Sequence, residues 1–351
     1  MRTPNFDFVG RSRLWAMISG ALVLVSLGSL LIGGLDLSID FVGGTAYRLE
    51  GIDPETTSDD LRAAAEDAGA RDVLPQLQGE GDTRGALVRT DAMEPGSDEA
   101  LAVERALVEV SDADNATISF VGPNWGQRIT QQALEALLVF MVVVVIYISF
   151  RLEFKMAVAA VVALVHDLLI TIGLYALVGF NVSPATVIAL LTILGYSLYD
   201  TVVVFDRVKE NAVQLGEPGR RTYAQLINAS MNEVLYRSLN TSITSVLPVA
   251  ALLFIGAQVL GATTLQDLAL ALFLGMAVGV YSSLFVASPF LAWWKMREPE
   301  QRKAAERETE RLARGDEPDA EVAAPTASAS RRAPITTEYV RGEGKRKKRR
   351  R

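Results

Sequence analysis

Ionisable residues inside apolar stretches are the strongest indication of chemistry in this sequence, because charge within a membrane helix is costly and typically marks a proton or ion pathway. Asp200 lies six residues before a charged boundary at Asp206, about 9 Å deeper at 1.5 Å per residue. His166 and Asp167 lie about ten residues inside a second apolar stretch, and Arg237 stands at the start of a third. If these helices pack together, we expect Asp200, Asp167, His166 and Arg237 to form one buried network.

Other polar residues accompany Asp200 and Arg237 at helical spacing. Thr192, Tyr196 and Asp200 are spaced i, i+4 and i+8 and therefore share a helix face. The residues that follow Arg237 at i+3, i+4 and i+7 are Asn240, Thr241 and Thr244. A polar stripe on a membrane helix must face protein or a wet cavity, because lipid offers no hydrogen-bond partners. We expect these residues to support the network.

Two interpretations of Asp200 remain open from the residues alone. Burial disfavours the charged form of a carboxylate and a nearby Arg favours it, so a carboxylate balanced between the two can bind a proton from one side of a membrane and release it to the other. The alternative is a static buried pair of Asp200 and Arg237 that only fixes helix packing. His166 fits either a proton pathway or an interhelical hydrogen bond.

The elements that must position these residues are apolar stretches. Of the 351 residues, 50% are hydrophobic, and the mean hydropathy is +0.25. A membrane helix needs roughly 20 apolar residues. Six stretches meet this need, at 15–35, 133–150, 156–180, 185–205, 238–259 and 268–294. Glycines at 20, 28, 195, 275 and 279 indicate positions where helices approach closely.

The charges of the short loops predict the orientation. Lys and Arg gather before the first span, between the second and third, between the fourth and fifth, and after the sixth. By the positive-inside rule both termini are cytoplasmic. This gives a cytoplasmic N-terminus at 1–13, a first span at 14–35, an outer domain at 36–130, a five-helix remainder at 131–296 and a cytoplasmic tail at 297–351. We expect a multi-pass membrane protein with both termini in the cytoplasm.

The segment 36–130 holds 20 acidic against 7 basic residues and is expected outside. Its pattern predicts strands at 46–51, 73–78, 85–89 and 116–121, with helices at 59–68 and 98–110. Thr57 with Asp60 forms a plausible capping box, and Ser97 can cap the second helix. The order βαββαβ is that of a ferredoxin-like α+β domain, so the fold class is six membrane helices plus this domain between the first and second.

The tail after residue 297 is rich in charge, Ala, Pro and Ser, and it ends in a basic run at 345–351. Such a composition predicts disorder, and the basic run indicates contact with anionic lipids rather than with a specific nucleic acid. The chain has no Cys, one His and no phosphate-binding loop. We therefore expect no metal, no cofactor and no enzymatic activity.

Four stretches of this sequence resemble the SecF family, the smaller partner of SecD in bacterial protein export. The residues Asp40, Phe41, Gly43 and Gly44 look like the family's signature after the first span. The pair at 166–167, the stretch 194–207 and the start of the fifth span at 236–242 are similar to further family motifs. The resemblance covers residues 6–294 and implies that the membrane is a bacterial cytoplasmic membrane.

The resemblance implies a resistance-nodulation-division type of fold, completed as a pseudo-symmetric pair by SecD. It implies docking on the SecYEG channel, often with YajC, and use of the proton motive force to promote late translocation. By motif position, Asp200 and Arg237 would be proton-pathway residues, with Asp167 and His166 as helpers. The outer domain would assist the translocating polypeptide or support the partner.

Two other classes of function stay open. One is a purely structural partner of SecD, in which Asp200 is a packing residue. The other is half of a small-molecule or lipid exporter of the same superfamily, although such exporters usually carry two six-helix halves in one chain. The choice between protons and sodium ions also stays open.

Overall fold

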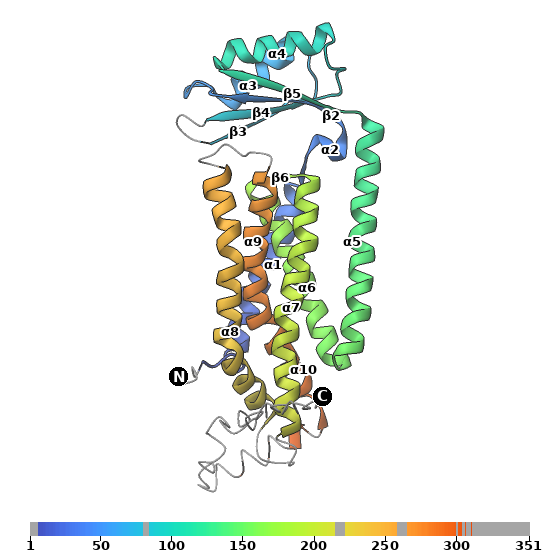
Figure 1. Cartoon of the computed structure of the whole chain (residues 1–351), viewed down its shortest axis with the longest axis vertical. Coiled ribbons are helices and arrows are strands. Elements are labelled where there is room, and N and C mark those ends of the chain that lie inside the picture. Colours follow the sequence, from blue (N-terminus) through green and yellow to red (C-terminus); the bar gives the residue numbers. More distant parts are fainter. Residues whose placement is uncertain are drawn as a thin grey trace, which may run out of the picture.

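The computed structural model of the chain describes residues 6–79, 84–214, 222–257, 265–299, 301–303, 306 and 310. It has two parts, a bundle of long helices and a small domain of strands and helices stacked on one end of it (Figure 1). We call residues 44–121 the head domain. The predicted tail lies mostly outside the described residues, and so does its basic run at 345–351.

Six helices in the described residues are long and apolar enough to cross a membrane, which confirms the prediction of six spans. The first five are α1 (Ser12–Ile32), α5 (Pro123–Arg151), α6 (Phe154–Val178), α7 (Pro184–Gln214) and α8 (Tyr223–Ala251), the last of which continues as the π-helical turn η2 (Leu252–Ala257). The sixth comprises α9 (Gln266–Ser282), the π-helical turn η4 (Ser283–Ala287) and α10 (Ser288–Lys295). Both α7 and α8 extend beyond the predicted apolar stretches at the end of the bundle away from the head domain.

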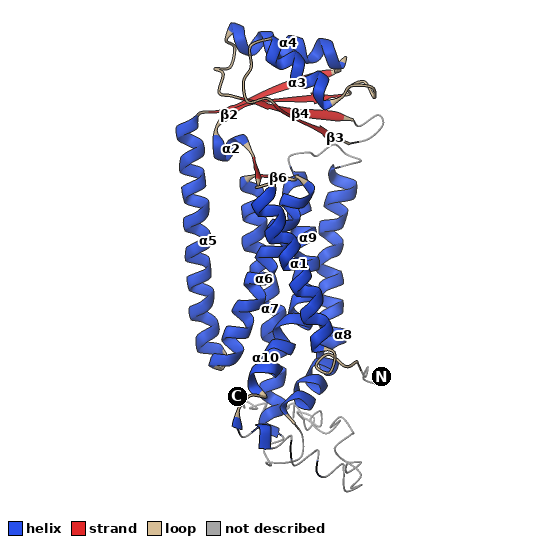
Figure 2. Ribbon diagram, turned by 180° about the vertical axis from the view of Figure 1, so that it is seen from behind, coloured by secondary structure: helices blue, strands red, loops and turns tan. Residues whose placement is uncertain are grey.

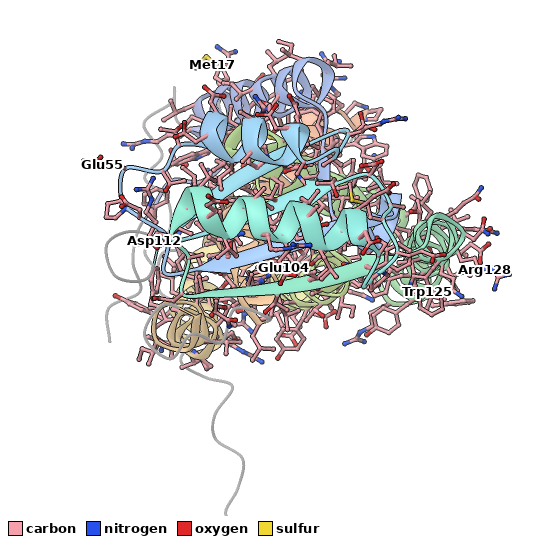
Figure 3. All side chains as sticks on the ribbon, turned by 90° about the horizontal axis from the view of Figure 1, so that it is seen from above. Met17, Glu55, Glu104, Asp112, Trp125 and Arg128 are labelled. Atoms are coloured by element: carbon pink, nitrogen blue, oxygen red, sulfur yellow. The ribbon has the colours of Figure 1, made fainter. Side chains whose placement is uncertain are left out.

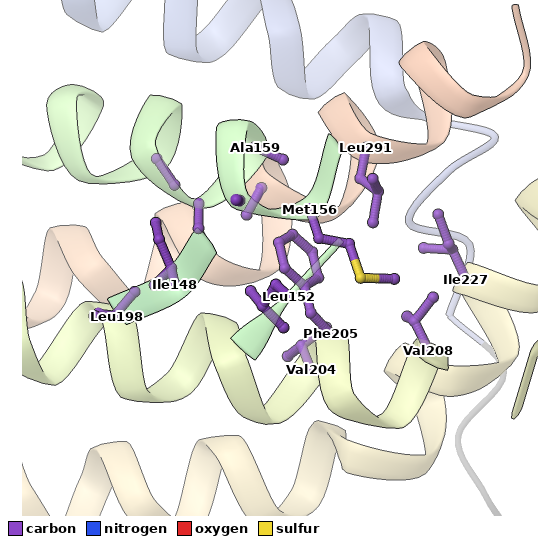
Figure 4. Close-up of a cluster of buried hydrophobic side chains, with 14 of the residues drawn as sticks. Ile148, Leu152, Met156, Ala159, Leu198, Val204, Phe205, Val208, Ile227 and Leu291 are labelled. Carbon is purple, nitrogen blue, oxygen red and sulfur yellow. The ribbon is translucent and has the colours of Figure 1, made fainter. Parts of the chain in front are cut away.

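The bundle packs around α6, α7 and α9, and the ribbon of α5 is set further out than the others (Figure 1). A cluster of buried apolar side chains fills the end of the bundle opposite the head domain, where Met156, Phe205 and Leu291 meet from α6, α7 and α10 (Figure 4). Ile148 and Leu152 add the end of α5 and its turn into α6 to the same cluster. Side chains of α5 therefore pack on the bundle even though its ribbon is set apart.

Glycines bring helices together at fewer of the predicted positions than expected. A Cβ on Gly275 would lie 2.2 Å from the Cδ1 atom of Ile193, and one on Gly279 would lie 3.2 Å from the Cβ atom of Ser197, so these two predictions are confirmed. An added Cβ on Gly20, Gly28 or Gly195 would meet nothing within 4 Å in the described part of this chain, so the close approach expected at these three is not made within the chain. The closest approach is at Gly173 of α6, where a Cβ would lie 2.1 Å from the Cβ atom of Ser26 on α1.

The head domain has the predicted βαββαβ order. Its elements are β2 (Gly44–Glu50), α3 (Ser58–Asp67), β3 (Leu74–Gln78), β4 (Gly85–Thr90), α4 (Asp98–Ser111) and β5 (Asn115–Val121). The sheet is antiparallel in the order β3-β4-β2-β5. Both helices cover the face that points away from the bundle (Figures 2 and 3). This is the ferredoxin-like arrangement, and it is confirmed.

Local sequence signals explain where the head-domain helices begin. The Thr57 hydroxyl accepts the backbone N–H of Asp60, and the Asp60 carboxylate accepts the backbone N–H of Thr57, which is the predicted capping box. Hydrogen bonds from Thr57 hold the pKa of Asp60 below its usual range. The Ser97 side chain caps α4 as predicted. In the core between sheet and helices, burial raises the pKa of Tyr47 to about 12, and Glu104 and Asp91 add to the rise.

The head domain is joined to the bundle by backbone as well as by side chains. The two-residue strand β1 (Asp36–Leu37) pairs in parallel with β6 (Asn181–Val182), which lies between α6 and α7. From β4 the buried Arg89 donates to the Leu37 carbonyl at 2.6 Å and pairs with Asp36. The Gln76 side chain of β3 donates to the Gly179 carbonyl at 3.0 Å. The sheet therefore rests on the loop that connects α6 to α7.

Candidate proton-binding site

Asp200 of α7 is buried inside the bundle and is 6% exposed. Its carboxylate accepts hydrogen bonds from two serine hydroxyls that come from two other helical segments. Ser238 Oγ of α8 lies 2.6 Å from Oδ1 and 2.8 Å from Oδ2, and Ser283 Oγ of η4 lies 2.5 Å from Oδ2. Three parts of the fold therefore converge on one carboxylate.

A second buried carboxylate lies on the neighbouring helix α6. Asp167 is 1% exposed, and its Oδ2 atom accepts a hydrogen bond from Ser197 Oγ of α7 at 2.5 Å. His166 is 6% exposed, and its Nδ1 atom lies 3.5 Å from Asp167 Oδ1. The His166 ring stacks on Tyr281 with centroids 6.2 Å apart, while both ring nitrogens lack a hydrogen-bond partner among the described residues. This pair is separate from the hydrogen bonds of Asp200.

Arg237 does not join this buried region, and the predicted network of four residues is wrong on this point. Within the described residues, the hydrogen bonds to Asp200 come from serines, and the Arg237 side chain is exposed. The reason is helical geometry, since successive residues of an α-helix point about 100° apart. Ser238 faces Asp200, so its neighbour Arg237 points outward.

Most of the predicted supporting residues lie on the surface of the bundle, and one has a buried hydroxyl. Arg237 shares its outward position with Asn240 and Thr244, which are exposed, and with the partly exposed Thr241. Thr192 of α7 is also exposed, and its hydroxyl donates to the backbone carbonyl of Ile188 at 2.8 Å. The Tyr196 hydroxyl is buried without a hydrogen-bond partner in the described part of the chain. The polar stripe of α8 therefore lies on the outer surface of this chain.

Charged residues at the end of the bundle away from the head domain are paired, unlike Asp200. Arg151 binds Asp206 at 2.7 Å, and Arg207 binds Glu233 at 2.5 Å. Asp200 lies one to two helical turns further into the bundle and is bound by hydroxyls. Asp200 is therefore a buried carboxylate whose hydrogen-bond partners in the described residues are neutral hydroxyls.

The serines that hold the two carboxylates were not predicted. Ser238 and Ser283 bind Asp200, and Ser197 binds Asp167. Ser238 lies beside the predicted stripe, about 100° around the helix from Arg237. Polar residues surround this part of α8, so the sequence gave no sign of which of them turns inward. The signal that was present is the pair Ser282–Ser283 inside an apolar stretch, since hydroxyls buried in a membrane helix need partners.

The predicted signature after the first span lies where the head domain meets the bundle, far from Asp200 along the helices. Asp40 and Phe41 belong to the short helix α2 (Ile39–Val42), and Phe41 is buried against the ends of α6, α7 and α9. Gly43 and Gly44 have φ values of 78° and 132°, which favour glycine. A Cβ on Gly44 would lie 2.7 Å from the Thr90 carbonyl oxygen. The signature thus builds a tight turn into the head domain.

Six membrane helices, a ferredoxin-like domain between the first two and a buried carboxylate site define a multi-pass membrane protein of a transport type. Residues 102–297 match the family model described as "Protein export membrane protein SecD/SecF, C-terminal". A relative from Streptomyces coelicolor, "Protein translocase subunit SecF", is 42% identical over 318 residues, which are 89% of this chain and 82% of the relative. The chain belongs to the SecF family.

A second kind of relative combines SecD and SecF in one chain. "Protein translocase subunit SecDF" of Thermus thermophilus is 37% identical over 303 residues, which are 85% of this chain and 40% of that relative. A crystal structure of SecDF from this organism, described as a translocon-associated membrane protein, has a TM-score of 0.73 and 35% identity and covers 84% of this chain and 39% of that one. SecD and SecF are thus parts of one polypeptide in this relative.

Proposed function

We propose that this chain is an accessory subunit of the Sec protein translocase that works with SecD and uses the proton motive force to promote translocation. Membership of the SecF family supports the first part. The observation that supports the second is Asp200, a carboxylate buried in the bundle and bound by hydroxyls from α8 and η4. A membrane potential contributes about 2.3 kcal/mol per charge per 100 mV, enough to bias a protonation cycle at such a group.

The polar stripe of α8 supports SecD as the partner within the membrane. Arg237, Asn240 and Thr244 are exposed on this chain, although lipid offers them no hydrogen-bond partners. A second set of membrane helices packed on α8 would bury them, and the joining of SecD and SecF in one chain in the SecDF relative supports SecD as their source. Arg237 would then lie at the interface, one residue from Ser238, and would act on Asp200 from the partner's side.

The remaining assignments follow from charge and from family membership. Lys and Arg at the bundle end away from the head domain favour an orientation with both termini in the cytoplasm. The head domain would then lie outside, where the translocating polypeptide emerges. SecYEG, and YajC with it, would be the partners of the assembled pair, and the basic run at 345–351 would contact anionic lipids.

The test is gradient-dependent export of a secreted precursor into vesicles that carry Asp200→Asn together with SecD. The substitution keeps the size and hydrogen bonding of the side chain and removes its titration. We expect the variant to copurify with SecD and to lose the gradient-dependent part of export. The control is Asp206→Asn, which changes the same residue type six positions along α7 at an ion pair with Arg151. Export at the wild-type level in Asp200→Asn would show that Asp200 only fixes packing.

A further inference from the structure

Ser283 differs from the other partner of Asp200 in having two acceptors within reach. Its Oγ atom lies 2.5 Å from Asp200 Oδ2 and 3.2 Å from the Val280 carbonyl oxygen. In the described residues, Ser238 Oγ makes hydrogen bonds to the two oxygens of Asp200 alone. A hydroxyl has one hydrogen to donate and two lone pairs to accept with. Ser283 can therefore reverse its role toward Asp200 without leaving its own hydrogen unpaired.

This difference matters when Asp200 changes its charge. As a carboxylate, Asp200 accepts from both serines. As a carboxylic acid, it carries a hydrogen on one oxygen, and that oxygen becomes a donor that needs an acceptor. An unpaired polar hydrogen in a buried site costs the desolvation of that group. The partner of the protonated oxygen must therefore be able to accept, and Ser283 has the alternative acceptor that frees it to do so.

We propose that Oδ2 is the oxygen of Asp200 that takes the proton and that Ser283 is a positioning residue that partners it in both charge states. This rests on the proposed function, because it presupposes proton uptake at Asp200. Uptake forms the Oδ2–H bond, which donates to Ser283 Oγ, and the Ser283 hydroxyl turns its hydrogen to the Val280 carbonyl. Release breaks the Oδ2–H bond, and the Ser283 hydrogen returns to Oδ2. The serine keeps its own proton throughout, while Ser238 continues to donate to Oδ1.

The backbone around Ser283 favours this role. Ser283 begins the π-helical turn η4, and single π-helical turns within α-helices are frequent at functional sites. The Ser283 side chain is fully buried, so no bulk water replaces it as a partner. The helices packed against Asp200 carry further titratable groups, among them His166 and Asp167 on α6, Glu233, Tyr236 and Arg237 on α8, and Asp267 and Tyr281 on α9. None of these is hydrogen-bonded to Asp200 in the described part of the chain.

The chain offers a matched control at the next residue. Ser282 is as deeply buried as Ser283, but its hydroxyl donates to the Ala163 carbonyl at 3.3 Å instead of Asp200. We expect Ser283→Ala to lower the gradient-dependent part of export about tenfold, because a hydrogen bond to a charged group is lost. Ser282→Ala removes the same number of atoms and should stay near wild type. Ser283→Thr keeps the hydroxyl and should restore most of the activity, since Thr also bonds carbonyls of the preceding turn.

Infrared difference spectra of the complex with SecD, taken between acidic and alkaline pH, give a reading that does not depend on export. The C=O stretch of protonated Asp200 is identified by its loss in Asp200→Asn. We expect this band to shift in Ser283→Ala, where the acid has lost its acceptor, and to stay in place in Ser282→Ala. An unshifted band in Ser283→Ala, or an equal loss of export in both alanine variants, would overturn the role of Ser283 and leave the proposed function standing. A wild-type spectrum without the Asp200 band would overturn both.

Discussion

The contact between α1 and α6 gives a prediction whose magnitude follows from the geometry. At Gly173 an added Cβ would lie 2.1 Å from Ser26 Cβ and 2.5 Å from Ser26 Cα. Carbon atoms in contact are about 3.5–4.0 Å apart, so Gly173→Ala requires a separation of roughly 1.4 Å or more between the helices. The other buried residue of α1, Ser19, is hydrogen-bonded to Tyr281, and Trp15 packs on Phe285, so the helix is also held on the N-terminal side of this contact. Forcing extra volume into such a contact costs about 1–3 kcal/mol.

The measurement is unfolding of the purified protein by a denaturing detergent added to mild micelles, followed by tryptophan fluorescence, since Trp15 lies in α1. A cost of about 1–3 kcal/mol corresponds to roughly a 5- to 150-fold change in the unfolding equilibrium. The control is Gly28→Ala, two residues from Ser26 on the same helix, where a Cβ meets nothing within 4 Å. The reasoning would be refuted if Gly173→Ala unfolded at the same detergent concentration as wild type and Gly28→Ala.

Two further predictions concern the head domain. Hydrogen bonds from Thr57 lower the pKa of Asp60 in the folded domain. The capping box therefore stabilises the domain at pH values above the ordinary Asp pKa of about 3.9, and this stabilisation is lost as the pH falls through the lower pKa of the folded state. Thermal melts of Thr57→Ala should therefore show less acid dependence than wild type, and an identical dependence would contradict this. Arg89→Ala should weaken docking of the head domain by about 1.5–3 kcal/mol, because charge-assisted hydrogen bonds to Asp36 and Leu37 are lost. We expect Arg89→Ala to be cleaved faster than wild type within residues 33–43. The control is Arg71→Ala, which replaces an exposed arginine of the same domain and should be cleaved at the wild-type rate.

The architecture could be predicted because its signals are local. Membrane spans show as long apolar stretches, and the head domain shows its strands, caps and turns within short windows. Thr57 with Asp60 and the cap at Ser97 were found from spacing alone. Each of these features depends on residues within one element, so no knowledge of the packing was needed.

The partners of Asp200 could not be predicted because they depend on how three helices are rotated against each other. A shift of one residue turns a side chain by about 100°, which exchanges Arg237 for Ser238 as the group that faces Asp200. The π-helical turn at Ser283 adds a residue to the local turn and breaks the periodicity on which the sequence argument relies. Which glycines contact another helix of this chain could not be predicted for the same reason, since Gly28 and Gly173 look alike in sequence and differ in what lies opposite.

The parallel pairing of β1 with β6 gives the head domain a mechanical connection to the carboxylates. The strand β6 links α6 to α7, the helices that carry Asp167 and Asp200. Its backbone is hydrogen-bonded to β1, which begins the segment that leads into the sheet. A tilt of this helical hairpin would be transmitted through the β1–β6 hydrogen bonds to the segment that leads into the head domain. Peptide groups make this link, and the ion pair of Asp36 with Arg89 and the burial of Val182 reinforce it.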